Sequence, residues 1–136
     1  MSIIKINYCI KGELYMKELN RTIGAFGEDL AINFLIRKNH TLIERNFRKR
    51  NGEIDIITKF KDIIVFTEVK TRYTLRYGLP CEAVDYKKQN KIKSIASYFI
   101  HINKLYNINI RFDVIQIFLN TYDDNYKIIY IEDAFR

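Results

Sequence analysis

Two neighbouring segments, residues 53–59 and 63–71, constrain the fold of this chain more than any other feature. Both are rich in Ile and Val, and only three residues join them. This pattern is typical of two antiparallel strands linked by a tight turn. Because apolar residues occur on both faces of each segment, we expect a sheet that is covered on both sides.

The rest of the chain supplies elements to cover such a sheet. Apolar residues at helical spacing predict helices over about 20–38 and 86–102, which Asn20 and Asp85 are suited to cap. Three further segments predict strands: 42–48, 110–118 and 126–131. The resulting order, α-β-β-β-α-β-β, predicts an α/β fold in which one mixed sheet is flanked by helices on both faces.

The size and charge of the chain suit one domain with a polyanionic partner. The chain has 136 residues, of which 48% are hydrophobic, and a single proline leaves no proline-rich linker. Its net charge of +7 makes nucleic acid the first candidate partner. A basic protein without such a partner fits the charge as well.

Several classes of protein are disfavoured. Cys9 and Cys81 do not form a CxxC pair, so we expect neither a zinc site nor a disulfide framework, and a reducing compartment is the default. The sequence contains no run of about 18 apolar residues, which is the length that would predict a membrane span. Lys5 and Asn7 interrupt the start of the chain, which does not read as a signal peptide. We therefore expect a cytoplasmic protein with no membrane partner.

The predicted hairpin gathers carboxylates. Strand alternation places Glu53 and Asp55 on one face, with Ile54 and Ile56 on the other. A turn centred between residues 61 and 62 then sets Asp55 opposite Glu68, and Glu53 opposite Lys70. Directly opposed like charges are unfavourable, so the group needs a cation besides Lys70.

A divalent metal ion would answer that need. Mg²⁺ or Mn²⁺ suits hard oxygen ligands, and Asp55 and Glu68 supply the one or two carboxylates that Mg²⁺ usually takes. Such an ion activates water and stabilises charge on a phosphate, while Lys70 would orient or help to deprotonate the water. The alternative is a surface hairpin with exposed Glu–Lys pairs. The apolar flanks of the segment favour a site.

The first predicted helix carries another acid, Glu28. Its helical neighbours are small or apolar, and Gly24 and Gly27 would let the helix lie close to the sheet. Glu28 could then add a metal ligand. It could equally be an acid that favours the positive end of the helix dipole or reaches solvent.

Basic residues flank the hairpin and could hold phosphates without reading bases. We assign this role to Arg48, Arg50, Arg72, Arg76 and Lys88. Gln89 is a weaker candidate beside the metal site, as is Glu53. Tyr73 and Tyr77 could stack on an unpaired base. The alternative is that the cations form a solvated face and the tyrosines pack on the core.

Two other kinds of polar residue are not assigned to chemistry. Asp113 alternates with apolar neighbours in a predicted strand, and we interpret it as part of a structural ion pair with Arg111 or a lysine. His40 and His101 lie at or near predicted helix ends, and neither is assigned to catalysis.

Several motifs in this order resemble the YraN family of bacterial proteins, over about residues 20–136. The matching segments are 27–28 (GE), 46–48 (NFR), 51–57 (NGEIDII), 65–72 (VFTEVKTR), 77–80 (YGLP), 82–84 (EAV), 87–89 (KKQ), 111–114 (RFDV) and 134–135 (AF).

The resemblance implies a restriction-endonuclease-like fold of the PD-(D/E)XK superfamily, similar to Holliday-junction resolvases. It implies that Asp55 is the first acid of the motif, that Glu68 and Lys70 form the (D/E)XK pair, and that Glu28 is the acid on the leading helix. Ile54 stands where the motif has proline. The resemblance also implies symmetric dimers, so a homodimer is expected if two nearby cuts are made. Activity in the family is itself inferred from fold.

The family pattern begins just before the first helix, so residues 1–18 are interpreted as an N-terminal extension, or a misassigned start, before a nuclease-like domain at 19–136. The leading hypothesis is a Mg²⁺- or Mn²⁺-dependent endonuclease acting on DNA, including branched or damaged DNA. The alternatives are a non-catalytic nucleic-acid-binding protein of the same fold and a protein-binding adaptor. The intact set Asp55, Glu68 and Lys70 favours the first.

Overall fold

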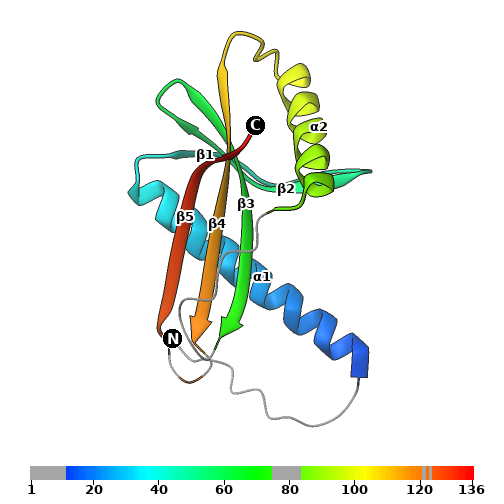
Figure 1. Cartoon of the computed structure of the whole chain (residues 1–136), viewed down its shortest axis with the longest axis vertical. Helices are drawn as coiled ribbons and strands as arrows, with labels where there is room; N and C mark the ends of the chain where they lie inside the picture. Colours follow the sequence, from blue (N-terminus) through cyan, green and yellow to red (C-terminus); the bar gives the residue numbers. More distant parts are fainter. Residues whose placement is uncertain (1–11, 75–83, 121, 123) are drawn as a thin grey trace.

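The structure is a computed structural model of the chain, and it describes residues 12–74, 84–120, 122 and 124–136. Within these residues the elements follow the predicted α-β-β-β-α-β-β order (Figure 1). They are α1 (Gly12–Arg37), β1 (Thr41–Lys49), β2 (Gly52–Phe60), β3 (Ile63–Thr74), α2 (Tyr86–Ile102), β4 (Asn109–Asn120) and β5 (Tyr126–Phe135). None of the described helices has the length and apolar character needed to cross a membrane.

The five strands form one mixed sheet in the order β1-β2-β3-β4-β5. Strands β3 and β4 are parallel, from Ile63 beside Asn109 to Thr74 beside Asn120, whereas the other neighbours are antiparallel. A parallel pair needs a crossover, and the connection between β3 and β4 contains α2. The prediction of a mixed sheet is confirmed.

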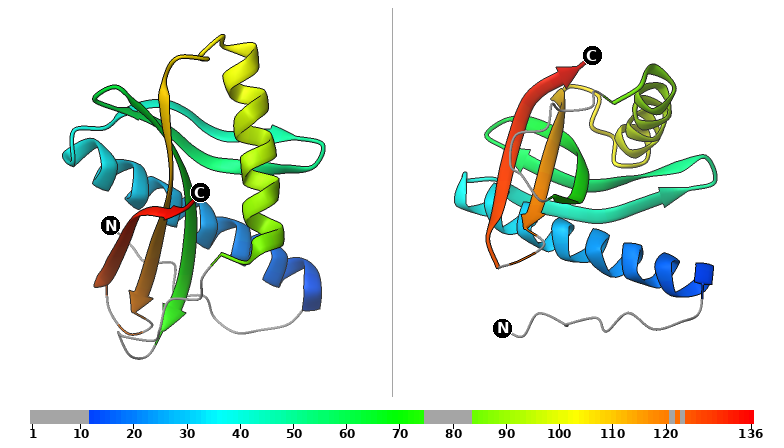
Figure 2. Two further views of the ribbon diagram at one scale, coloured as in Figure 1. Left: turned by 45° about the horizontal axis from the view of Figure 1, so that its top comes forward. Right: turned by 60° about the horizontal axis from the view of Figure 1, so that its bottom comes forward.

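The two helices cover opposite faces of the sheet, as Figure 2 shows. Apolar side chains of α1 pack against those of β2 and β4 in one buried cluster, which includes Leu35, Ile56 and Ile117. The larger cluster on the other face joins α2 to the sheet and includes Phe66 and Phe99. Both faces of the central strands are therefore buried, which accounts for their near-continuous apolar sequence.

The predicted start is right for one helix and wrong for the other. Helix α2 begins after Asp85, whose carboxylate accepts the backbone N–H of Lys88 at 2.8 Å, so this predicted cap is confirmed. Helix α1 begins at Gly12, and the prediction that Asn20 starts it is wrong. The residues before Asn20 include Glu, Leu, Met and Lys, which favour helix, so the helix continues through them. The proposed domain boundary at residue 18 stays a prediction.

Strand β2 changes partners along its length. It pairs with β1 from Gly52 to Lys59, but its pairing with β3 runs only from Ile56–Thr67 to Phe60–Ile63. The first half of β2 therefore leaves β3 and continues with β1 as a two-stranded ribbon that extends past α2 (Figure 1).

Side-chain alternation is interrupted at this divergence. Ile54 and Ile57 belong to the cluster under α2, whereas Ile56 belongs to the cluster under α1. The prediction that Ile54 and Ile56 share a face is therefore wrong. Two-stranded ribbons twist more strongly than wide sheets, so the face of β2 rotates once β3 no longer pairs with it. Asp55 lies at this point.

Candidate functional site

Two buried carboxylates meet where β2 leaves β3. Asp55 is 7% exposed and Glu68 is 6% exposed. Asp55 lies one residue beyond the last β2–β3 pair, and its Oδ2 accepts the backbone N–H of Val69 at 2.7 Å. The side chain of Asp55 thus takes up a backbone donor of β3 at the divergence, next to Glu68.

The electrostatics of this pair are unfavourable for two negative charges. Burial, followed by the negative charge of Glu68, raises the pKa of Asp55 to about 8. The charges of Glu28 and Glu53 raise it further, and only the Val69 N–H bond opposes them. Without an added cation, Asp55 therefore holds a proton at neutral pH. A ligand that brings positive charge would favour the ionised pair.

Glu68 has one satisfied oxygen and one that is not. Its Oε1 forms an ion pair with Nζ of Lys88 in α2, at a distance of 2.7 Å. Its Oε2 is buried and has no hydrogen-bond partner within the described residues. A buried acceptor without a partner costs free energy, roughly 1–3 kcal/mol and more for a charged group. This oxygen is therefore suited to a ligand that brings positive charge.

Glu28 approaches the pair from α1 but is held by other groups. Its Oε2 accepts hydrogen bonds from Nδ2 of Asn46 at 3.0 Å and from Nη2 of Arg45 at 3.3 Å. Glu28 is close enough to raise the pKa of Asp55. Its role as a metal ligand stays a prediction.

The close approach of α1 depends on Gly27. A Cβ added there would lie 2.7 Å from Cβ of Thr71 in β3, and closer still to its Oγ1. A Cβ at Gly24 would meet nothing within 4 Å. Of the two glycines predicted to bring helix and sheet together, only Gly27 does so.

Glu53 and Lys70 do not form the predicted cross-strand pair. Strand β2 pairs with β1 at Glu53, so Glu53 faces Arg48 and binds its Nε at 2.8 Å. Lys70 is partly buried in β3, beside Gln116 of β4 in the parallel register. Within the described part of the chain no carboxylate forms an ion pair with Lys70. Its position beside an ion stays a prediction.

The residues present fit a divalent ion with few protein ligands. Among the residues that the structure describes, no group of three or more His, Cys, Asp or Glu side chains lies together as a metal site. Mg²⁺ commonly takes one or two carboxylates and completes its shell with water and phosphate oxygens. Asp55 and the unpartnered Oε2 of Glu68 match that requirement.

A basic pocket adjoins the carboxylates, between the β1–β2 turn and α2. Its volume is about 460 Å³. It is lined by Arg48, Lys49, Arg50, Asn51, Gly52, Glu53, Lys88, Lys91 and Ile92. Three of the five predicted phosphate-binding residues therefore lie together here. Lys88 joins this pocket to Glu68, a contact that the sequence did not reveal.

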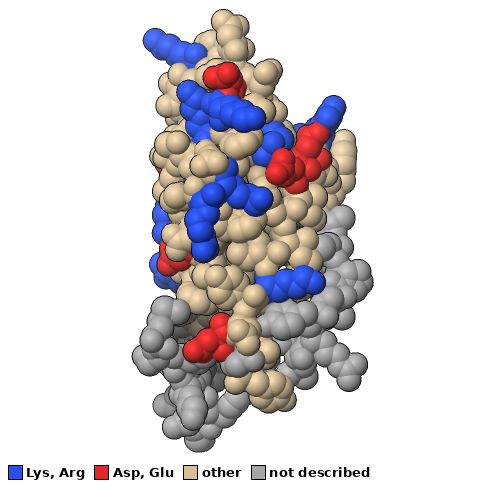
Figure 3. All heavy atoms as spheres, turned by 90° about the vertical axis from the view of Figure 1, so that its left-hand side faces the viewer, with Lys and Arg blue, Asp and Glu red and all other residues tan. Residues whose placement is uncertain are grey.

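Basic side chains are not confined to this pocket. Figure 3 shows Lys and Arg spread over another face, the left-hand side of Figure 1, with Asp and Glu between them. Charge alone therefore does not mark the pocket. Its hollow shape and its connection to Glu68 through Lys88 distinguish it.

The remaining predicted site residues lie elsewhere. Gln89 donates its side-chain amide to the carbonyl of Val84 at 2.8 Å, which ties the amide to the start of α2. Arg72 is exposed in β3. Arg76 and Tyr77 lie outside the described residues.

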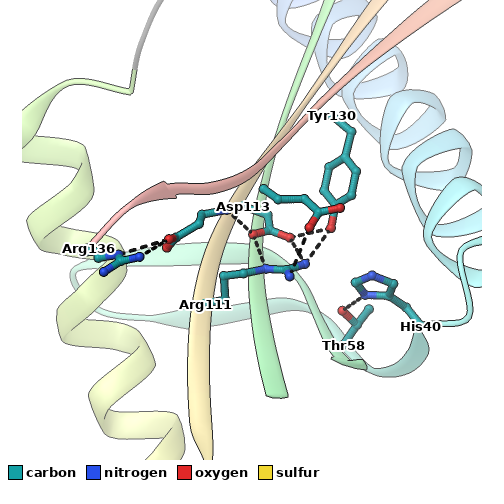
Figure 4. Close-up of polar contacts among 8 residues, drawn as sticks. His40, Thr58, Arg111, Asp113, Tyr130 and Arg136 are labelled. Atoms are coloured by element: carbon teal, nitrogen blue, oxygen red, sulfur yellow. Dashed lines mark hydrogen bonds and ion pairs between the residues drawn. The ribbon is translucent and has the colours of Figure 1, made fainter. Parts of the chain in front are cut away.

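A second buried acid, Asp113, has a full set of partners (Figure 4). Nε and Nη2 of Arg111 each donate to it at 2.8 Å, Tyr130 donates its hydroxyl at 2.5 Å, and the backbone N–H of Asp133 donates at 2.9 Å. The predicted ion pair with Arg111 is confirmed. Tyr130 and Asp133 were missed, because they come from β5 and no local pattern links them to β4.

His40 borders this network. Its Nδ1 lies 2.9 Å from Oγ1 of Thr58, and its ring stacks on Phe60. Burial, followed by the positive charge of Arg111, lowers the pKa of His40. These contacts support the neutral imidazole in a structural position.

The similarity of this chain to known proteins extends over most of its length. The family described as "Uncharacterised protein family UPF0102" matches residues 27–117. A UPF0102 protein of Clostridium novyi is 48% identical over 120 residues, covering 88% of this chain and 100% of the relative. A UPF0102 protein of Clostridium kluyveri is 50% identical over 121 residues, covering 89% of this chain and 99% of the relative. The chain therefore belongs to the UPF0102 family, the YraN family.

Proposed function

We propose that this protein is a divalent-metal-dependent endonuclease that hydrolyses phosphodiester bonds in DNA. The observation that carries the proposal is the buried Asp55–Glu68 pair, in which one oxygen has no partner among the described residues and which Lys88 links to a basic pocket. Buried carboxylates that lack compensation are costly to a fold, so their presence favours a ligand-dependent role.

We assign metal binding, phosphate binding and charge balance to different residues. Asp55 and Glu68 would hold Mg²⁺ or Mn²⁺, which when bound supplies activation of water and stabilisation of charge on the phosphate. Arg48, Arg50 and Lys91 line the adjoining pocket and would bind the phosphates that flank the reacting bond. Lys70 would balance negative charge as it develops on the phosphate.

The test is a cleavage assay on linear, flapped and four-way DNA, with RNA substrates in parallel, in Mg²⁺ and in Mn²⁺. We expect at least one DNA substrate to be cut, and Asp55→Ala and Lys70→Ala to lower the rate by about 100-fold or more. Asp62→Ala removes an exposed carboxylate from the β2–β3 turn and is the matched control, with an unchanged rate. Circular dichroism would establish that each variant is folded.

A non-catalytic nucleic-acid-binding protein is the second candidate. The basic pocket supports it independently of the carboxylates, because its cations can bind phosphates without hydrolysis. Salt-dependent DNA binding with no cleavage of any substrate in either metal would favour this candidate over the endonuclease. Binding that is independent of salt would count against both.

A further inference from the structure

Lys88 connects the carboxylate pair to the basic pocket. It lies in the first turn of α2, where the Asp85 cap holds its backbone N–H. Its Nζ is 2.7 Å from Oε1 of Glu68, although 45% of its side chain is exposed. The ammonium thus reaches a buried oxygen from a side chain that is free to move without unpacking the core.

The charges around Lys88 favour this position. Burial lowers the pKa of Lys88, but the hydrogen bond and charge of Glu68, with the charges of Asp55 and Glu53, raise it overall. The ammonium therefore acts as the cation of the site. It is a poor substitute for a divalent ion, because it carries one charge and leaves Oε2 of Glu68 without a partner in the part of the chain that the structure describes.

We propose that Lys88 is a displaceable counter-ion, which competes with a divalent cation for Glu68. The inference rests on the proposed function, since it requires that the pair Asp55 and Glu68 binds such a cation. A divalent ion placed between these carboxylates repels the ammonium. The same side chain lines the basic pocket, so displacement moves its charge towards the place where phosphates would bind.

The experiment is a calorimetric titration of the whole chain with MnCl₂ or MgCl₂, without nucleic acid. A pH of 8.5 limits the competition of protons for the carboxylates. Lys88→Met removes the ammonium while keeping a flexible stem of similar length. We expect the metal to bind about tenfold more tightly to this variant than to the wild type, because a positive charge within a few ångströms of the ion is lost.

Lys87→Met is the matched control, since it lowers the net charge equally from the neighbouring, exposed position of α2. We expect its metal affinity to change by less than about twofold, because exposed charges are screened. Equal tightening in both variants would show a general effect of net charge and would overturn the inference.

The outcomes separate the inference from the function on which it rests. If the wild type binds metal and Lys88→Met binds it equally or more weakly, Lys88 is not a competitor, and the endonuclease proposal stands. If neither protein binds metal, both proposals are overturned, because the carboxylate pair does not hold a cation. If only Lys88→Met binds measurably, the competition is supported in its strongest form.

Discussion

The two polar centres of this sheet differ in the partners that they provide for their buried acids. Asp113 is fully buried and accepts four hydrogen bonds, two of them from the guanidinium of Arg111 (Figure 4). Asp55 and Glu68 are buried almost as deeply, yet the described residues give them only one ammonium and one backbone N–H, and leave one oxygen without a partner.

Burial is thus similar at both centres, and the number of partners and the balance of charge separate them. A buried carboxylate with a full set of donors is stable in its place and contributes to the fold. A buried carboxylate with too few donors destabilises the fold unless a ligand completes it. The comparison assigns Asp113 to structure and the Asp55–Glu68 pair to function. It also predicts opposite effects for the same substitution.

The largest effect is expected for Asp113→Asn. The variant leaves the guanidinium of Arg111 without its buried counter-ion, so we expect the free energy of unfolding to fall by about 3–5 kcal/mol. Urea denaturation followed by circular dichroism measures this loss. A decrease of less than about 1 kcal/mol would mean that Asp113 is not a structural centre.

The same change at Asp55 is expected to have the opposite sign. In the metal-free protein, Asp55→Asn removes a buried negative charge beside Glu68 and keeps an oxygen that can accept the Val69 N–H. We expect a gain of about 2 kcal/mol in the free energy of unfolding at pH 8.5, together with loss of metal binding. Asp62→Asn, at an exposed turn, should leave both quantities unchanged. Destabilisation comparable to that of Asp113→Asn would break the comparison.

The pH dependence of the free energy of unfolding should reflect titrating groups at both centres. The folded pKa of Asp55 is raised from 3.8 to about 8, so its protonated form stabilises the fold, and stability is lost as pH rises from about 4 to about 8 and levels off above that. The pKa of His40 is lowered from 6.5, so stability is lost as pH falls below about 6.5. Each group contributes a slope of up to about 1.4 kcal/mol per pH unit.

Urea denaturation of the metal-free protein from pH 5 to pH 9 measures both slopes. Asp55→Asn should remove the loss that accumulates as pH rises from 5 to 8. His40 opposes this trend below pH 6.5, so His40→Gln should make stability fall more steeply with rising pH in that range. Saturating Mg²⁺ should also flatten the alkaline side, because the ion favours the ionised carboxylates. A wild-type profile that stays flat between pH 6.5 and 8 would contradict the assignment of Asp55.

A smaller effect is expected from the glycines of α1, of which only Gly27 lies close against β3. Gly27→Ala places a methyl group against Thr71, and we expect a loss of about 1–2 kcal/mol with weaker metal binding. Gly24→Ala meets open space and should instead stabilise the helix, by up to about 1 kcal/mol. Thermal denaturation of the pair tests this difference in sign. Equal effects would show that the helix does not need its close approach.

Local rules predicted the parts of the site that depend on neighbouring residues. The turn between Lys61 and Asp62 placed the two strands in the register that the structure shows from Ile56 to Phe60. That register brings Asp55 next to Glu68 at its open end. Asp85 was predicted to cap α2 because a helix start needs an acceptor within a few residues along the chain.

The sequence by itself therefore determined the order of elements, the covered sheet and the two acids of the hairpin, since alternation and turn length act over short distances. Only the tertiary structure decided which partners those acids have. The divergence of β2 from β3 turned Glu53 towards Arg48, and the crossover placed Lys88 on Glu68. The pairing of β5 with β4 brought Tyr130 and Asp133 to Asp113. Side-chain partners from distant segments depend on how the whole sheet twists and packs, which no local pattern encodes.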